Sequence, residues 1–169
     1  MSPRLGYLGL GSNVGQRQAA ISRALELLAG RGVEVLAVSS LYETQPVGEV
    51  LDQPDFLNAA ARIETSLEPL ELLDACKSVE AEMGRDFGAI RHGPRPIDID
   101  LLLLGDIELE HERWRRPHRE VSTRRFVLVP LLELDPELAL PKGPRLDGFL
   151  AGLGAGQEVE MVGRLEGSS

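Results

Sequence analysis

The chain has 169 residues, 43% of them hydrophobic and 27% charged, which is typical of an ordinary globular domain. Its formal net charge of −9 argues against nucleic-acid binding by bulk charge. No apolar run approaches the ~20 residues of a membrane span, and the N-terminus lacks a signal-peptide pattern, so we expect a cytoplasmic protein without membrane association. The single cysteine, Cys76, cannot form an internal disulfide and fits a reducing compartment.

Six periodic segments predict an alternation of strands and helices. In chain order they are strand 5–10, helix 16–30, strand 33–42, strand 56–65, helix 66–84 and strand 97–104. This βαββαβ order predicts a ferredoxin-like α+β sandwich, an antiparallel sheet with both helices on one face. C-terminal additions follow, with a short helix over 122–135 interrupted at Pro130, and a glycine-rich, poorly specified tail over 143–169 whose last residues we expect to be mobile. We expect one domain spanning 1–169.

The turn after the first strand, Gly9–Gly15, resembles a dinucleotide-binding fingerprint. It departs from that fingerprint because the third glycine is displaced by one position and Val14 stands in its place. We therefore interpret the segment as a tight turn in which Ser12 or Asn13 caps the following helix.

Two aspartates stand two residues apart in the apolar segment Ile97–Leu104. Because side chains alternate along a strand, Asp98 and Asp100 share one face, and the apolar side chains at odd positions from Ile97 to Leu103 share the other, which we expect to face the helices. Two neighbouring carboxylates repel each other and are costly to desolvate. A hard cation such as Mg²⁺, which takes carboxylate and phosphate oxygens, would offset that cost, and a pair of solvated acids is the alternative.

Arginines gather on both sides of this strand. Arg85, Arg91 and Arg95 come before it, and six arginines with His118 lie between positions 113 and 125. Guanidinium groups form bidentate contacts with phosphate oxygens, so the segments predict a discrete anion site. An ordinary solvated surface is the alternative interpretation.

A third set of residues suits a flat heterocycle. Phe56 and Asn58 share one face of strand 56–65, the face that we expect to carry Asp98 and Asp100 on their strand. Two aromatic rings, here Phe56 and Phe126, can sandwich a heterocycle, and an asparagine amide offers both donors and an acceptor to its edge. The alternative is that both rings belong to the core.

These residues resemble those of a known family. Four segments, in this order, carry the likeness: Gly11-Ser12-Asn13; Asp52-Gln53-Pro54-Asp55-Phe56-Leu57-Asn58; Gly93-Pro94-Arg95-Pro96-Ile97-Asp98-Ile99-Asp100; and Pro117-His118 with Arg124 and Phe126. Over roughly residues 5–142, the chain resembles 6-hydroxymethyl-7,8-dihydropterin pyrophosphokinase, an enzyme family of folate biosynthesis. The resemblance implies a ferredoxin-like fold and the transfer of diphosphate from ATP to the hydroxymethyl group of the reduced pterin, with release of AMP.

The resemblance also assigns residues. It implies two Mg²⁺ ions that hold the triphosphate on Asp98 and Asp100. The pterin pocket corresponds to Thr44, Gln45, Val47, Phe56, Asn58 and Phe126. The nucleotide and phosphate contacts correspond to Leu73, Lys77, Glu80, Arg85, Arg95, Leu101, Arg113, His118 and Arg124. The residues expected to act on the transferred group are Arg95, Asp98, Asp100, His118 and Arg124, and no general base is assigned, with Asp100 only a candidate.

Three positions depart from the pattern of the family. Relatives often have arginine, tryptophan and tyrosine where this chain has Phe87, His92 and Arg119. These changes leave the reaction class intact and bear on the loop before the aspartate strand. Two other functions stay open, another Mg²⁺-dependent nucleotidyl- or phosphotransferase and a nucleic-acid-binding module on the same fold. The sequence leaves the oligomeric state open.

Overall fold

A computed structural model of the chain describes residues 3–13, 15–44, 55–84, 97–105, 107, 109–111, 114–116, 125–140, 143–153 and 159–164. Its strands are β1 (Arg4–Ser12), β2 (Val33–Val38), β3 (Leu41–Thr44), β4 (Phe56–Thr65), β5 (Asp98–Leu104), β6 (Leu109–His111), β7 (Trp114–Arg116) and β8 (Val159–Gly163). Its helices are α1 (Arg17–Ala29), α2 (Pro69–Glu82), α3 (Arg125–Leu134) and α4 (Leu146–Gly152). Within these ranges, no helix is long and apolar enough to cross a membrane.

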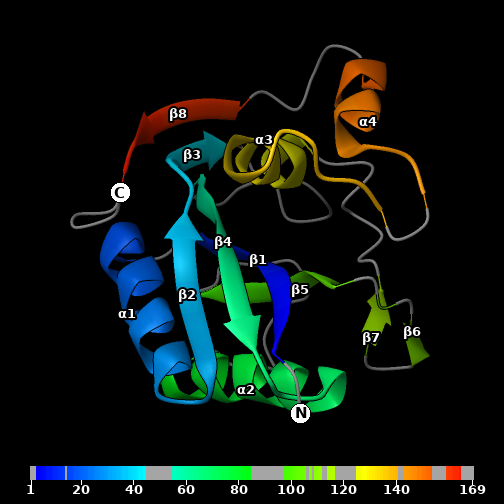
Figure 1. Cartoon of the computed structure of the whole chain (residues 1–169). Helices are drawn as coiled ribbons and strands as arrows, with labels where there is room; N and C mark the ends of the chain where they lie inside the picture. The colour runs from blue at the N-terminus through cyan, green and yellow to red at the C-terminus, as the bar shows by residue number, and fades with distance from the viewer. Residues whose placement is uncertain are drawn as a thin grey trace.

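One antiparallel sheet organises the fold (Figure 1). Its strand order is β5-β1-β4-β3-β8, and β2 pairs with β4 beside β3. The long central strand β4 therefore pairs with β1 along one edge and with β2 and β3 in succession along the other. β6 and β7 form a separate two-stranded ribbon. The predicted α+β class with an antiparallel sheet is confirmed.

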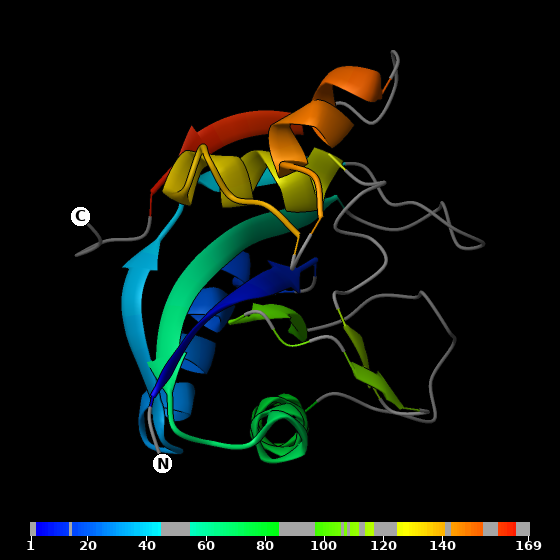
Figure 2. The ribbon, with the colours of Figure 1, turned by 45° about the vertical axis from the view of Figure 1, so that its right-hand side comes forward.

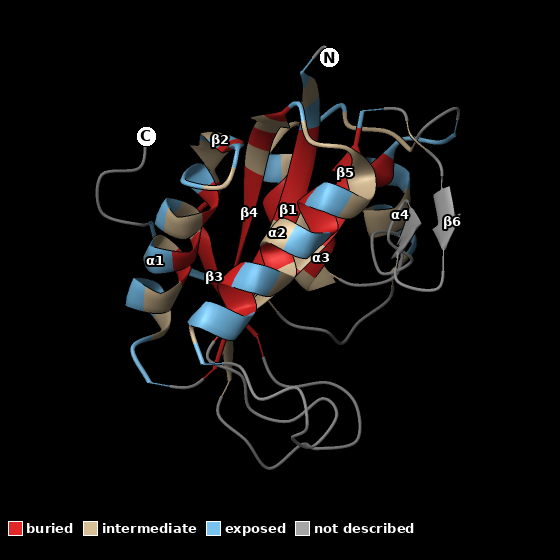
Figure 3. Ribbon diagram, turned by 90° about the horizontal axis from the view of Figure 1, so that it is seen from below, coloured by how far each residue is buried: buried red, intermediate tan, exposed pale blue. Residues whose placement is uncertain are grey.

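The sheet lies between two apolar layers (Figures 1 and 2). On one face, α1 and α2 pack against the strands, and the sides of these helices that face the sheet are buried (Figure 3). Leu8, Ile63 and Leu72 are among the fully buried side chains there. On the other face, α3 and α4 pack against a smaller cluster around Leu102 and Leu128. The prediction that the two central helices share one face is confirmed, and the C-terminal helices cover part of the opposite face.

Local sequence signals explain where α2 begins and ends. Pro69 occupies the first turn, where its missing N–H costs nothing. Glu68 is the N-cap, and a capping box links it to Glu71, whose carboxylate accepts a hydrogen bond from the Glu68 amide at 2.9 Å. Gly84 follows the helix with φ of +91°, a conformation that favours glycine. These observations confirm that a helix forms here, and its bounds, Pro69–Glu82, lie inside the predicted range 66–84.

The predicted strand over 33–42 is in fact two strands. β2 pairs with Ala61–Thr65 and β3 with Phe56–Asn58, so the chain must step along β4 between them. Ser39 makes that step, since its amide donates to the Ala60 carbonyl and its hydroxyl accepts from the Ala60 amide, both at 2.9 Å. The apolar periodicity of the sequence does not predict such a step. At this point the Ser39 hydroxyl replaces a backbone carbonyl as the partner of the Ala60 amide.

The capping prediction for the first helix is wrong. α1 is capped at Gln16, and no side-chain hydrogen bond caps it. Ser12 instead ends β1, and Ser12 and Asn13 are both buried. The strand runs further than the glycines suggested because Gly9 and Gly11 are in the sheet, paired with strands on both sides.

The described part of the C-terminal third contains more regular structure than its composition indicates. α3 continues through Pro130, which is buried. Packing there outweighs the hydrogen bond that proline removes from a helix interior. Within 143–169, α4 and β8 are regular elements, and β8 extends the sheet by pairing with β3. The sequence of β8 is too short to predict a strand by itself, and it forms one by pairing with β3.

A bulge changes the faces of β5. Leu101 pairs with Leu8, and Leu103 pairs with Tyr7, so Leu102 is the extra residue. Ile99 and Leu101 face the helices α1 and α2 as predicted. Leu103 belongs to the opposite cluster, so its predicted orientation toward those helices is wrong. The bulge lies beyond the two aspartates and leaves their alternation intact.

Candidate active site

The register of three strands places the predicted site residues in one row. Gly11 in β1 pairs with Asn58 in β4 on one side and with Asp98 in β5 on the other. One step along, Gly9 pairs with Ala60 and with Asp100. Directly paired residues point to the same face, so Asn58, Asp98 and Asp100 share a face, as the alternation predicted. Since adjacent strands lie about 4.8 Å apart, Asn58 and Asp98 stand about 10 Å apart across Gly11.

Gly11 leaves room at the centre of this row. A Cβ atom added there would lie 2.9 Å from the Asn58 Oδ1 atom, which is closer than real Cβ atoms come. The same position lies 3.7 Å from Cδ1 of Phe56. The floor between the asparagine and the aspartate is therefore bare backbone, a cradle that any side chain would fill. Gly11 thus lies between Asn58, predicted for the heterocycle, and Asp98, predicted for the metal, with the Asn58 amide oxygen close above it.

Asn58 is held in one orientation. Its Nδ2 atom donates to the Thr44 Oγ1 atom at 2.7 Å, and both side chains are buried. Thr44 pairs with Phe56 at the end of β3. The structure therefore brings together three of the residues predicted for the pterin pocket, Thr44, Phe56 and Asn58. With Nδ2 directed to Thr44, the Oδ1 atom lies toward the Gly11 floor.

Phe126 comes from a different layer. It lies in the first turn of α3 and is half-buried against the cluster of Tyr7, Ala60, Leu102 and Leu103. That cluster includes neighbours of the glycine row, since Ala60 pairs with Gly9. Phe56 is likewise half-buried. The two rings are therefore on the same side of the sheet, and their stacking on a heterocycle stays a prediction.

The donor set of the aspartate strand fits a hard cation. Asp98 and Asp100 are half-buried, on the face opposite to the apolar core. In the part of the chain that the structure describes, no cluster of three or more His, Cys, Asp or Glu side chains could hold a metal. Mg²⁺ needs no such cluster, because it is commonly bound by one or two carboxylates and by substrate phosphates. The pair fits a metal that arrives with a nucleotide.

Four residues predicted to contact the nucleotide lie around the helix-side core. Leu73, Leu101 and Glu80 are buried, and Leu73 and Leu101 belong to the apolar cluster under α1 and α2. Lys77 is 40% exposed, and its Nζ atom lies 3.2 Å from the Glu80 Oε1 atom. Of these side chains, Lys77 alone reaches the surface to any extent. The nucleotide contacts of all four stay predictions.

The remaining predicted residues lie outside the described part of the chain. They are Gln45, Val47, Arg85, Arg95, Arg113, His118 and Arg124. The segments with Phe87, Arg91, His92 and Arg119 lie outside it as well.

Sequence reasoning missed a polar network that fixes α3 on the sheet. The Glu133 carboxylate accepts hydrogen bonds from the Ser40 amide at 2.8 Å, from the Ser40 hydroxyl at 3.1 Å and from the Tyr42 hydroxyl. Burial, helped by the bond to Glu133, raises the pKa of Tyr42 above its ordinary value. Tyr42 pairs with Asn58, so this network adjoins the row of site residues. No local motif links residues 91 positions apart.

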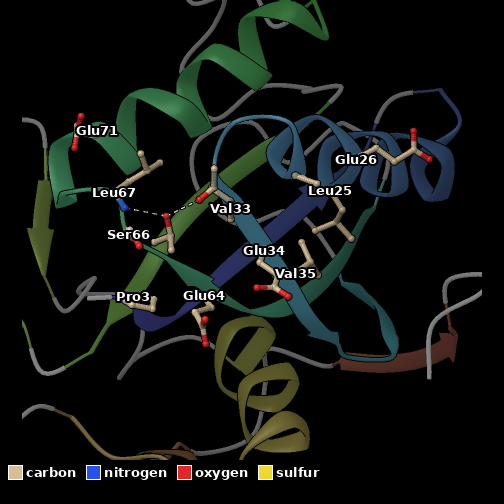
Figure 4. Close-up of a pocket in the computed structure, with 13 residues that line it drawn as sticks. Pro3, Leu25, Glu26, Val33, Glu34, Val35, Glu64, Ser66, Leu67 and Glu71 are labelled. Atoms are coloured by element: carbon tan, nitrogen blue, oxygen red, sulfur yellow. Dashed lines mark hydrogen bonds between the residues drawn. The ribbon is translucent and has the colours of Figure 1, made fainter. Parts of the chain in front are cut away.

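A groove at the other end of the sheet has different chemistry. It has a volume of about 1070 Å³ and is lined by glutamates and apolar side chains, among them Glu34, Glu64 and Leu67 (Figure 4). Glu34 and Glu64 are directly paired, and none of the thirteen described lining residues is Lys, Arg or His. A triphosphate would be repelled there. The groove is lined by Pro3, just before β1, whereas Gly9 and Gly11 lie near the other end of that strand.

Comparison with known proteins connects this geometry to one family. The family model described as 7,8-dihydro-6-hydroxymethylpterin-pyrophosphokinase matches residues 7–136. A 2-amino-4-hydroxy-6-hydroxymethyldihydropteridine pyrophosphokinase of Methylorubrum extorquens is 48% identical over 135 residues, which cover 79% of this chain and 84% of the relative. The matched region includes the glycine row and the aspartate strand.

Other similar proteins are longer. The folate synthesis bifunctional protein of Arabidopsis thaliana is 46% identical over 127 residues, which cover 75% of this chain and 26% of that protein. The chain thus spans about a quarter of the length of this relative. A crystal structure of Plasmodium falciparum HPPK-DHPS A437G with STZ-DHP has a TM-score of 0.68 at 16% identity, covering 89% of this chain and 45% of that one. At that identity the likeness concerns the fold alone.

Proposed function

Because the chain belongs to the 7,8-dihydro-6-hydroxymethylpterin-pyrophosphokinase family, we propose that it transfers diphosphate from ATP to 6-hydroxymethyl-7,8-dihydropterin in folate biosynthesis. The products are AMP and the pterin diphosphate. The observation that carries the proposal is the row Asn58–Gly11–Asp98, in which the Asn58 amide and the Asp98 carboxylate share one face of the sheet on either side of Gly11. Both substrates are small molecules, and we place the reaction in the cytoplasm.

In this proposal, the chain acts mainly by positioning. Asn58, held by Thr44, hydrogen-bonds the edge of the pterin, and Phe56 and Phe126 stack on its faces. The bare backbone at Gly11 lets the hydroxymethyl group extend from Asn58 toward Asp98. Its oxygen then attacks the β-phosphorus of ATP in line, and AMP leaves. Holding two reactants in this geometry removes much of the barrier to phosphoryl transfer.

The charged residues have separate proposed tasks. Asp98 and Asp100 would hold two Mg²⁺ ions, which supply neutralisation of the charge on the transferred phosphates when bound. Arg95 and Arg124 would stabilise the transferred group through guanidinium contacts, and His118 would hold the phosphates or the departing AMP. Arg85, Arg113 and Lys77 would bind the remaining phosphate charge. No general base is assigned.

An assay of AMP release tests this proposal. We expect the protein, with ATP, Mg²⁺ and 6-hydroxymethyl-7,8-dihydropterin, to form AMP and the pterin diphosphate. Asp98→Asn and Asp100→Asn should each lower turnover by about 100-fold or more, because each weakens a metal ligand. Asp147→Asn is the control, since Asp147 is exposed on α4 and its ion pair with Arg145 lies in another layer.

The outcomes separate the alternatives. Circular dichroism of each variant should match that of the wild type, which excludes unfolding as the cause. ADP in place of AMP would indicate a simple phosphotransferase and would overturn the proposal. Near-normal turnover in both site variants would overturn the assignment of the metal to Asp98 and Asp100.

A further inference from the structure

Glu80 is an unusual residue in its surroundings. Its side chain is 0% exposed, and it is the one charged side chain that is fully enclosed among the described residues. Its neighbours on the buried face of α2 are apolar or nearly so: Leu72, Leu73, Cys76 and Val79. Burying a carboxylate costs free energy, and an apolar side chain of similar size at such a site is often neutral or stabilising. Core packing alone therefore gives no reason for a glutamate at this position.

The carboxylate of Glu80 has two described contacts. Its Oε2 atom accepts a hydrogen bond from the Ile99 amide at 2.7 Å, and its Oε1 atom lies 3.2 Å from the Lys77 Nζ atom. Lys77 stands one turn before Glu80 on α2, so the ion pair links a half-exposed ammonium to the buried carboxylate. A hydrogen bond to a charged acceptor is stronger than a neutral one.

The hydrogen bond from the Ile99 amide to Glu80 lies at the edge of the sheet. β5 is an edge strand of the described sheet, with β1 as its one neighbouring strand there. The amides on the outer edge of such a strand need another partner. Glu80 supplies it at Ile99, which stands between Asp98 and Asp100. The peptide group that follows Asp98 is thus held from α2, while the two aspartate side chains point to the opposite face.

We propose that Glu80 is a positioning residue for the metal site, because its hydrogen bond to the Ile99 amide fixes the peptide between the two aspartates. The inference rests on the proposed function of Asp98 and Asp100 as metal ligands. Rotation of that peptide would turn the Asp98 carboxylate relative to that of Asp100, since their relative direction depends on the backbone angles between them. Residues that orient metal ligands in this way contribute strongly to metal affinity.

Substitutions at Glu80 test the proposal in the full chain. Glu80→Met fills the volume but removes the acceptor, and Glu80→Gln keeps an acceptor oxygen but removes the charge. Val79→Ala is the matched control, because Val79 is the adjacent residue of α2, is equally buried and lies in the apolar cluster. Its cavity lowers stability without touching the Ile99 amide.

Two measurements report on the site apart from turnover. Hydrogen exchange followed by NMR gives the protection of the Ile99 amide. Titration with Mn²⁺ in the presence of a non-hydrolysable ATP analogue, followed by electron paramagnetic resonance, gives the metal affinity. We expect Glu80→Met to lose protection at Ile99 and to weaken Mn²⁺ binding by about 10- to 100-fold, the usual effect of losing a group that orients metal ligands. Glu80→Gln keeps an acceptor for the Ile99 amide but loses the ion pair with Lys77, so it should lose less protection at Ile99 and weaken Mn²⁺ binding less than Glu80→Met. Pterin affinity should hardly change in either variant.

The results separate this inference from the proposed function. If Glu80→Met binds Mn²⁺ with the same affinity as Val79→Ala, the inference is overturned, even when the wild type is active. A wild type that releases no AMP and binds no Mn²⁺ with the nucleotide overturns the proposed function instead. If Glu80→Met does not fold, Glu80→Asp replaces it, because the shorter side chain keeps the charge but withdraws the carboxylate from Ile99. Wild-type Mn²⁺ affinity in Glu80→Asp, with Ile99 unprotected, likewise overturns the inference.

Discussion

The residue at the centre of the proposed site contributes by having no side chain. Gly11 stands between Asn58 and Asp98, and its backbone forms the floor on which the two substrates would meet. Its conformation is that of an ordinary strand, so the requirement for glycine comes from space and not from backbone angles. Gly9 and Gly11, which resembled part of a nucleotide-binding turn, therefore belong to the sheet, on the face where we propose that the substrates bind.

Gly11→Ala should weaken pterin binding. The new methyl group would lie 2.9 Å from the Asn58 Oδ1 atom, so Asn58 or the strand must shift. We expect the dissociation constant for the pterin to rise about tenfold, which corresponds to about 1.4 kcal/mol of lost binding free energy. Calorimetric titration measures it. Gly148→Ala is the control, since an added Cβ there meets nothing within 4 Å. Equal pterin affinity in the two variants would contradict the role of the Gly11 floor.

At the scale of elements, α3 links Phe126, a residue that we propose for the pterin pocket, to the sheet. Phe126 lies in its first turn, and Glu133 lies in its last. Glu133 binds the Ser40 and Tyr42 region, and Arg62 of β4 donates to the Leu134 carbonyl. The helix is thus anchored at its C-terminal end and presents Phe126 at the other. The apolar face of α3 packs against the sheet and stabilises the contact, and the polar contacts fix the position of the helix.

Glu133→Ala should destabilise the protein and reduce pterin binding together. It removes the acceptor of three hydrogen bonds, and bonds to a charged group contribute about 1.5–3 kcal/mol each before relaxation. We expect the free energy of unfolding to fall by about 2–4 kcal/mol, measured by urea denaturation. Glu137→Ala is the control, because Glu137 is exposed just beyond α3. Similar unfolding free energies in the two variants would refute the anchoring role.

At the scale of the whole molecule, both tyrosines of the chain lie between the sheet and α3. The Tyr7 hydroxyl donates to the Asp135 carboxylate at 3.2 Å, as Tyr42 does to Glu133. Burial is the main cause that raises the pKa of both tyrosines. Each carboxylate partner adds to the effect, because a tyrosinate beside it would be repelled. The folded state therefore favours the protonated form of both tyrosines.

The stability of the protein should fall in alkaline solution. Tyrosine ionises near pH 10 in the unfolded chain and at higher pH in the folded protein, so the unfolded state loses protons first. The tyrosine contribution is complete below about pH 10 and is lost as pH rises toward the folded pKa values, at up to about 1.4 kcal/mol per pH unit for each tyrosine. Denaturation at several pH values measures this loss. Absorbance at 295 nm should show less tyrosinate at pH 10 in the folded protein than in the unfolded chain, and half-ionisation in the folded protein would contradict the prediction.

Features of the fold that depend on neighbouring residues could be predicted from the sequence, and features that depend on distant residues could not. The helix α2 and the alternation of Asp98 with Ile99 depend on residues within one turn or one strand. Both were predicted, although the helix begins three residues later than the prediction. The break at Ser39, the bulge at Leu102 and the pairing of β8 depend on the strand alongside. The sequence of one strand does not show which strand it pairs with or in which register, so these features were not predicted.

The sequence by itself determined the α+β class, the sharing of one face by the two aspartates and the family resemblance, because alternation and motif spacing are properties of the linear chain. Only the tertiary structure decided that Gly11 separates Asn58 from Asp98, and that Glu80 reaches the amide between the aspartates. These contacts join elements far apart in the chain. They arise from strand register and helix packing, which are settled when the sheet and its two apolar layers assemble.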